Sequence, residues 1–168
     1  MAFSADELFL AKLATALRKT RLEAIVVGNM ASMLNDAPVL TQDVDLLVRD
    51  TKLNRKKLRQ LAEELGGVGP ERLSGLTATE HIYGTDIPID ILYEKMAGGL
   101  KFASVKSRAR PHVVGNKGEL LLVASLADII KSKTAANRPK DRAVLPILRD
   151  TLAARRAAGR EGPEPEAK

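Results

Sequence analysis

The chain has 168 residues and a formal charge of +6, from 27 Lys and Arg against 21 Asp and Glu. This length predicts one domain, and the 45% of hydrophobic residues excludes a wholly disordered chain. Because the chain has no Cys, disulfides, thiolate catalysis and Cys-ligated metal centres are excluded as well.

The N-terminal segment is amphipathic and begins with acidic residues. Ser4 and Glu7 form a capping-box pattern, and leucines then recur at helical spacing, so we expect a helix over residues 5–19. A signal peptide would begin with basic residues, and no apolar run approaches the about 20 residues of a membrane-spanning helix. We therefore expect a cytoplasmic protein.

Short strands and helices alternate in the next part of the chain. Residues 24–27 are an apolar, β-branched run that predicts a buried strand, and residues 44–48 predict a second strand. We expect a short helix over residues 30–34 and a longer one over residues 53–65, which ends before a Gly-Gly pair. The order predicts a sheet with covering helices.

The second half predicts further strands and then two helices. Strands over 79–83 and 87–93, joined by Gly-Thr-Asp, form a hairpin pattern. Residues 101–123 alternate basic and apolar side chains, which predicts edge strands. Helices are expected over 125–137, where Ser begins the helix, and over 139–157, where Pro does.

These elements predict an α/β (α+β) fold, with a small mixed β-sheet flanked by helices and two C-terminal helices. We expect a core over residues 1–122, a C-terminal helical segment over 123–158 packed on it, and a disordered tail over 159–168. There is no G-x-G-x-x-G and no Walker loop, so two common nucleotide folds lack their signature.

The charge is unevenly distributed. Residues 1–100 hold 12 basic and 14 acidic side chains, whereas residues 101–160 hold 14 basic and 4 acidic ones. This asymmetry favours a polyanionic ligand with carboxylates nearby, although solubilising Lys and Arg on helices would give the same count.

Three aspartates form the candidate catalytic cluster. Asp43 and Asp45 lie two apart where a strand begins, so both side chains leave the same face and suit Mg²⁺. Asp90 is the one charge in a later apolar strand. If the two strands are neighbours, the cluster would hold divalent ions for phosphoryl transfer; otherwise these are solvated strand-end acids.

Gly28 and Asn29 follow the first strand and precede a short helix. A glycine there permits close approach of the backbone to a phosphate, and it also fits a simple strand-to-helix turn. His81 lies on the strand before Asp90, where it either faces the site or has a structural role.

The order of these motifs resembles the polymerase-beta-type nucleotidyltransferase superfamily. Gly28-Asn29, the Thr-x-Asp-x-Asp-Leu-Leu-Val stretch from Thr41 and a third Asp on a later strand are similar to its small AbiEii-type members, associated with toxin–antitoxin systems. Lys133 and the Arg-Pro-Lys-Asp stretch from Arg138 resemble the helical block of the same group.

The resemblance implies roles for individual residues. Metal ions, Mg²⁺ or Mn²⁺, would be bound by the three catalytic carboxylates of Asp43, Asp45 and Asp90. Nucleotide would be bound by Gly28, Asn29, Lys133 and Arg138, with Asp141 supporting Arg138. Asn29 departs from the usual Ser or Gly and adds bulk beside the triphosphate, which puts activity in question.

The resemblance implies a metal-dependent nucleotidyltransferase that moves an NMP from an NTP to an acceptor hydroxyl and releases pyrophosphate. Expected partners are the NTP, an RNA (including tRNA), protein or small-molecule acceptor, and a cognate toxin or antitoxin. One alternative is a catalytically weakened protein of this fold that acts as a nucleotide-binding or antitoxin-like module; another is a basic nucleic-acid-binding protein. Lys101, Lys106, Arg108 and Arg110 would form the basic surface for an RNA acceptor.

Overall fold

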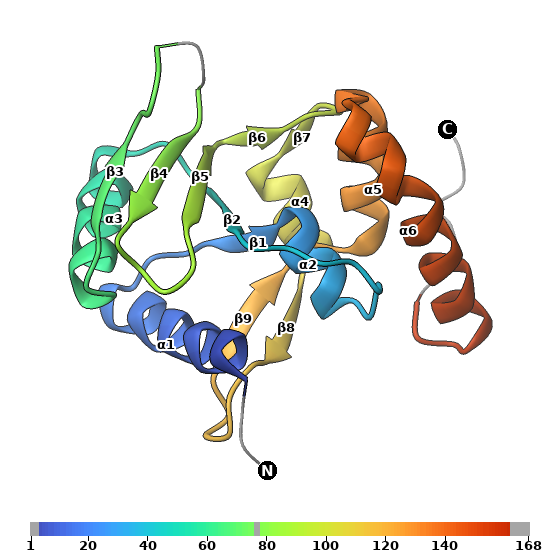
Figure 1. Cartoon of the computed structure of the whole chain (residues 1–168), viewed down its shortest axis with the longest axis horizontal. Helices are drawn as coiled ribbons and strands as arrows, with labels where there is room; N and C mark the ends of the chain where they lie inside the picture. The colour runs from blue at the N-terminus through green and yellow to red at the C-terminus, as the bar shows by residue number, and fades with distance from the viewer. Residues whose placement is uncertain (1–3, 76–77, 162–168) are drawn as a thin grey trace.

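The computed structural model describes residues 4–75 and 78–161. A seven-stranded mixed sheet has the order β3-β4-β5-β2-β1-β9-β8, and helices flank it (Figure 1). This is the mixed α/β fold predicted from the sequence. Of the predicted tail over 159–168, residues 162–168 lie outside the described residues.

The strands of the sheet are short. They are β1 (Ile25–Val27), β2 (Val44–Val48), β3 (Val68–Glu71), β4 (Glu80–Tyr83), β5 (Ile89–Tyr93), β8 (Arg110–Val113) and β9 (Leu120–Val123). A separate hairpin pairs β6 (Lys95–Met96) with β7 (Leu100–Lys101). The helices are α1 (Ala5–Thr20), α2 (Gly28–Leu34), α3 (Lys52–Glu64), α4 (Phe102–Arg108), α5 (Leu126–Ala136) and α6 (Pro139–Ala157).

Local sequence signals fix several helix ends. In α1 the Ser4 hydroxyl accepts a hydrogen bond from the Glu7 amide, and the Glu7 carboxylate accepts one from the Ser4 amide, so the predicted capping box is present. Ser125 caps α5 in the same way by accepting a hydrogen bond from the amide of Asp128. Each cap satisfies a backbone N–H that has no partner within the helix.

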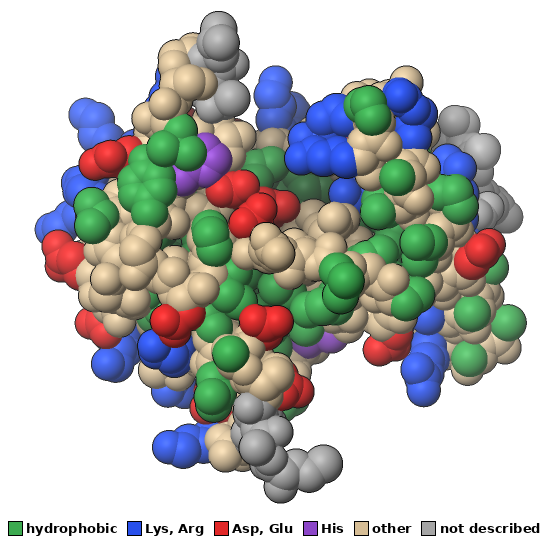
Figure 2. Space-filling model, in the orientation of Figure 1, with side chains coloured by type: hydrophobic (Ala, Val, Ile, Leu, Met, Phe, Trp, Pro, Cys, Tyr) green, Lys and Arg blue, Asp and Glu red, His purple; other side chains and the backbone are tan. Residues whose placement is uncertain are grey.

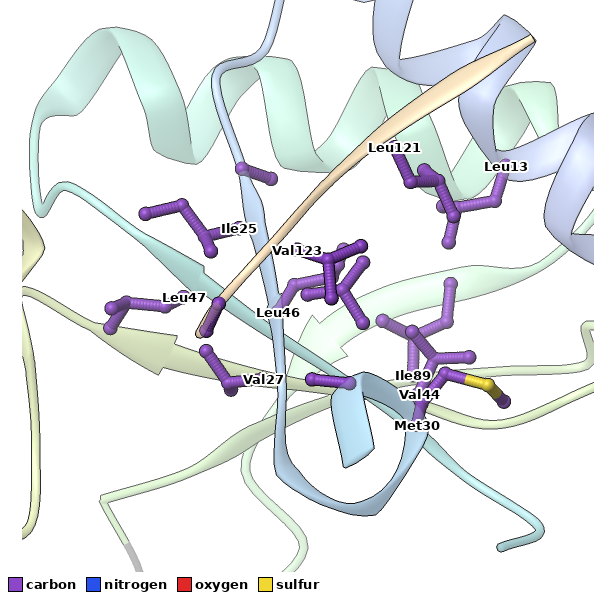
Figure 3. Packing of buried hydrophobic residues seen from close by; sticks show 14 of the residues in the cluster. Leu13, Ile25, Val27, Met30, Val44, Leu46, Leu47, Ile89, Leu121 and Val123 are labelled. Carbon is purple, nitrogen blue, oxygen red and sulfur yellow. The ribbon is translucent and has the colours of Figure 1, made fainter. Parts of the chain in front are cut away.

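The central strands and the helices around them enclose the hydrophobic core. Side chains from α1, β1, α2, β2, β5 and β9 converge in it (Figure 3), among them Leu13, Ile25, Met30, Leu46, Ile89 and Leu121. α3 covers one face of the sheet, since Arg55 stacks on Tyr93, whose side chain leaves β5 on the opposite face from Asp90. α2 packs on β1 and β2, α5 on α2, and α6 on α5.

The prediction of edge strands over residues 101–123 is wrong in two respects. Residues 102–108 form α4, because Phe102 and Val105 are three apart and both are buried, which places them on one face of a helical turn. β9 is an interior strand between β1 and β8, so of β8 and β9 only β8 lies at an edge of the sheet. Among the described residues, no helix has the length and apolar character needed to cross a bilayer.

Candidate active site

The predicted carboxylates meet where β2 and β5 lie side by side. The two strands pair in parallel, and Asp45 is in register with Asp90. Asp43 directly precedes β2, and all three residues line a cavity of about 240 Å³. The expectation that the Asp90 strand neighbours the Asp43 and Asp45 strand is therefore confirmed.

Asp45 is electrostatically strained by this arrangement. Burial, together with the nearby negative charges of Asp90 and Asp43, raises the pKa of its carboxyl from 3.8 to about 6. Lys133 and Lys140 oppose the shift. A site that brings carboxylates together at this cost is suited to a cation.

Gly28 makes the approach of α2 to Asp45 possible. Its φ is +67°, and a Cβ atom added to it would lie 2.1 Å from the Asp45 Oδ2 atom, so a larger residue would displace the carboxylate. The next residue, Asn29, also lines the cavity. No donor in the described part of the chain reaches its buried Oδ1 atom.

A basic wall faces the carboxylates. Lys133 of α5, and Arg138 and Lys140 where α6 begins, line the same cavity as the three aspartates. Figure 2 shows acidic side chains on one side of a hollow and Lys and Arg gathered over α5 and the start of α6 on the other. Opposed charges of this kind suit a metal-bound polyphosphate.

Asp141 positions two residues of this basic wall through hydrogen bonds. Its side chain is fully buried, and its carboxylate accepts hydrogen bonds from Arg138 Nε at 2.6 Å and from Lys133 Nζ at 3.5 Å. Burial disfavours the charged form, but the hydrogen bonds from Arg138 outweigh it and keep the pKa of Asp141 below its usual value. Two predicted phosphate ligands are thus fixed by one buried charge.

The carboxylates do not form a complete metal cage by themselves. Among the described residues, no group of three acidic or histidine side chains converges closely enough to hold a metal ion alone. This fits Mg²⁺, which takes one or two carboxylates and draws further ligands from water and substrate phosphates. The raised pKa of Asp45 shows that the residues present would gain from a cation.

The structure adds contacts that sequence reasoning left unassigned. His81 Nδ1 lies 2.6 Å from Asp90 Oδ1. Lys140, Thr41, Thr79 and Ser132 also line the cavity. Lys140 belongs to the Arg-Pro-Lys-Asp stretch, so its charge and its position at the start of a helix could have predicted that it lines the cavity. No local sequence feature predicts the same for Thr79 or Ser132.

Two of the four side chains of the predicted basic surface over residues 101–110 are paired with carboxylates. Lys106 pairs with Glu23 at 2.8 Å, and Arg108 binds both carboxylate oxygens of Asp128. The stretch has no acidic residue of its own, and both carboxylates come from other parts of the sequence.

Comparison with solved structures identifies the fold. Similar structures are ANT(2'')-Ia in complex with adenylyl-2''-tobramycin (TM-score 0.64, 17% identity, 93% of this chain and 94% of that chain) and a candidate nucleotidyltransferase, TM1012, of Thermotoga maritima (TM-score 0.56, 16% identity, 87% and 91%). No protein-family model and no curated protein matches the sequence. The chain therefore has the nucleotidyltransferase fold.

Proposed function

We propose that this protein is a metal-dependent nucleotidyltransferase. An acceptor hydroxyl oxygen would form a bond to the α-phosphorus of an NTP, and the bond from that phosphorus to the bridging oxygen of the β-phosphate would break. The NMP would pass to the acceptor, pyrophosphate would leave, and the hydroxyl proton would move to a carboxylate of the protein.

One observation carries this proposal. The parallel register of β2 and β5 places Asp45 beside Asp90 in a cavity whose opposite wall is Lys133, Arg138 and Lys140. Phosphoryl transfer depends mainly on positioning and on stabilising negative charge, and this cavity provides groups for both. A solved structure of similar fold, ANT(2'')-Ia, is in complex with adenylyl-2''-tobramycin, which supports nucleotide chemistry in this fold.

The basic wall and the α2 turn would bind the triphosphate. Lys133 and Arg138, fixed by Asp141, would neutralise phosphate oxygens. Gly28 leaves room for the Asp45 carboxylate and would let phosphate approach the backbone. The Asn29 amide would donate to a phosphate oxygen, while its Oδ1 would accept from the substrate.

The three aspartates would serve the reacting groups. Asp43, Asp45 and Asp90 would hold Mg²⁺ or Mn²⁺, which supplies charge neutralisation for the phosphates when bound. Asp90 would also accept the proton of the acceptor hydroxyl. The adjacent positions of Asp45 and Asp90 support a shared role of their carboxylates in metal binding.

The acceptor is proposed by class only. Adenylyl-2''-tobramycin bound to ANT(2'')-Ia supports a small-molecule hydroxyl, and the AbiEii-type resemblance supports tRNA or protein within a toxin–antitoxin pair. The alternative, a nucleotide-binding module without turnover, is supported by the bulk that Asn29 adds to the cavity lining.

Label transfer tests the proposal. The protein would be incubated with one α-³²P-labelled NTP at a time in the presence of Mg²⁺ or Mn²⁺. Separate reactions would contain bulk tRNA, protein or aminoglycosides as the acceptor. Asp45→Ala is expected to abolish transfer, whereas Asp150→Ala is a matched control because that acid is exposed on α6 outside the cavity.

The outcomes separate the candidates. Label on an acceptor that requires metal and Asp45 supports the transferase. Metal-dependent NTP binding without transfer to any acceptor supports the binding module. Transfer that persists in Asp45→Ala would contradict the assigned site.

A further inference from the structure

The hydrogen bond between His81 and Asp90 links the candidate catalytic acid to a neighbouring strand. His81 and Asp90 are directly opposite in the antiparallel β4–β5 pair, and His81 Nδ1 lies 2.6 Å from Asp90 Oδ1. Both side chains are mostly shielded from solvent, with exposed fractions of 20% and 27%. Opposite positions in an antiparallel pair bring side chains on one face into contact.

We propose that His81 is a positioning residue that fixes the orientation of the Asp90 carboxylate. The inference rests on the proposed function, because it concerns how Asp90 is presented to the acceptor. His81 itself does not line the cavity, whereas Asp90 does, so the imidazole acts through the carboxylate.

The chemistry of the two groups sets the direction of the hydrogen bond. An ionised carboxylate only accepts hydrogen bonds, so the proton lies on His81 Nδ1, which donates it to Asp90 Oδ1. This selects one tautomer of the imidazole.

Asp90 needs such a partner because an aspartate carboxylate rotates easily about its terminal torsion. Among the described residues, His81 is the only one that donates a hydrogen bond to the Asp90 carboxylate. Asp43 and Asp45 have no corresponding side-chain donor there, so the protein fixes only the carboxylate assigned to the acceptor side. Groups that orient metal-binding or reacting carboxylates typically change affinity or activity about 10–100-fold when they are removed.

Three substitutions of His81 separate positioning from packing. His81→Asn keeps an N–H donor close to the place of Nδ1, and His81→Gln instead keeps one close to the place of Nε2. His81→Phe keeps a ring of similar size without any donor. If the Nδ1 donor matters, the Asn variant keeps the wild-type metal affinity, while the Gln and Phe variants lose it equally.

Mn²⁺ alone is the first probe, with binding followed by electron paramagnetic resonance. We expect His81→Phe and His81→Gln to weaken Mn²⁺ binding about 10–100-fold, and His81→Asn to stay within a few-fold of wild type. Equal loss in all three variants, or no loss in any, overturns the proposal. Thermal unfolding of each variant identifies a general loss of structure.

The imidazole tautomer is the second probe, and it needs neither metal nor activity. The chain has two histidines, so a long-range ¹H–¹⁵N spectrum is assigned with His112→Gln. We expect a proton on Nδ1 of His81 in wild type and a shift of the proton toward Nε2 in Asp90→Ala. A wild-type imidazole that carries its proton only on Nε2 overturns the proposal.

The two probes also separate this inference from the proposed function. A wild-type protein that binds no Mn²⁺ contradicts the metal site, and the tautomer and its response to Asp90→Ala then decide the role of His81. A wild-type protein that transfers nucleotide while His81 shows the Nε2 tautomer keeps the function and overturns the positioning role.

Discussion

Gly28 and Asp45 are packed so closely that only a glycine fits between the start of α2 and the carboxylate. A Cβ atom on Gly28 would lie 2.1 Å from Asp45 Oδ2, well inside the contact distance, and the φ of +67° disfavours any other residue independently. The position of a candidate catalytic acid therefore depends on the absence of one methyl group.

Gly28→Ala is expected to impair both folding and the site. The left-handed backbone costs an alanine about 1–2 kcal/mol, and the clash with Asp45 adds about 1–3 kcal/mol unless the carboxylate moves. Gly66→Ala is the matched control, because Gly66 has a φ of +72° with no atom near the added Cβ. Urea unfolding and Mg²⁺-dependent NTP binding measure both effects; equal losses in the two variants would contradict the clash.

Asp45 is expected to make metal-free stability fall as pH rises. Its folded pKa, about 6, lies above the unfolded value of 3.8, so the folded state binds the proton more tightly. The resulting penalty is absent below pH 3.8 and complete above pH 6. Asp45→Asn should therefore be more stable than wild type by about 1–3 kcal/mol at pH 7.

Urea unfolding at pH 4 and at pH 7 in the presence of a chelator measures the difference between wild type and Asp45→Asn. The advantage of the variant should shrink toward pH 4, because the wild-type carboxyl is then protonated when folded. A difference that does not change with pH would show that Asp45 ionises normally.

Lys133 is expected to contribute to phosphate binding, unlike Lys131 on the same helix. Lys133 lines the cavity, whereas Lys131 is exposed outside it. A charge-assisted hydrogen bond contributes about 1.5–3 kcal/mol, so Lys133→Met should raise the Kd of ATP about 10–100-fold. Lys131→Met has the same charge change, and an equal effect there would indicate general electrostatic attraction only.

Asp141 is expected to stabilise the fold as well as the basic wall. Asp141→Asn removes the buried charge that Arg138 and Lys133 share. Since the Arg138 side chain is 55% exposed, solvent screening reduces the loss, which we place at about 1–3 kcal/mol. Asp150→Asn, an exposed change on the same helix, should stay within about 0.5 kcal/mol of wild type by urea unfolding.

The pKa of Asp141 also gives the sign of its pH dependence. Because its folded pKa lies below its usual value, its contribution is present above pH 3.8 and is lost as pH falls through the folded pKa. The deficit of Asp141→Asn relative to wild type should therefore narrow only below pH 3.8, whereas the advantage of Asp45→Asn over wild type shrinks between pH 6 and pH 3.8.

Local signals in the sequence predicted most elements of the fold. The capping pattern at Ser4, the β-branched run that forms β1 and the hairpin of β4 and β5 each depend on residues close in sequence. The helix α4 was not predicted, because alternating basic and apolar residues fit a strand as well as a short helix.

The charge pattern of the second half does not distinguish basic side chains that are paired with acids from those that line the cavity. Lys106 is bound by Glu23, which lies 83 residues away in sequence, and Arg108 by Asp128. Ion pairs between distant segments leave no periodic signal in the sequence. The segment that holds the paired Lys106 and Arg108 therefore has the same basic composition as the segment that lines the cavity.

Residue types and their spacing along the chain identify the components of the site: closely spaced carboxylates, a glycine before a short helix and a basic C-terminal half. Tertiary packing brings these components together, since it sets Asp45 in register with Asp90, joins Lys133 and Arg138 to Asp141, and hydrogen-bonds His81 to Asp90. Side-chain chemistry and local propensity depend on residues that are neighbours in sequence. Strand order and register instead follow from burying the apolar faces of the whole chain at once.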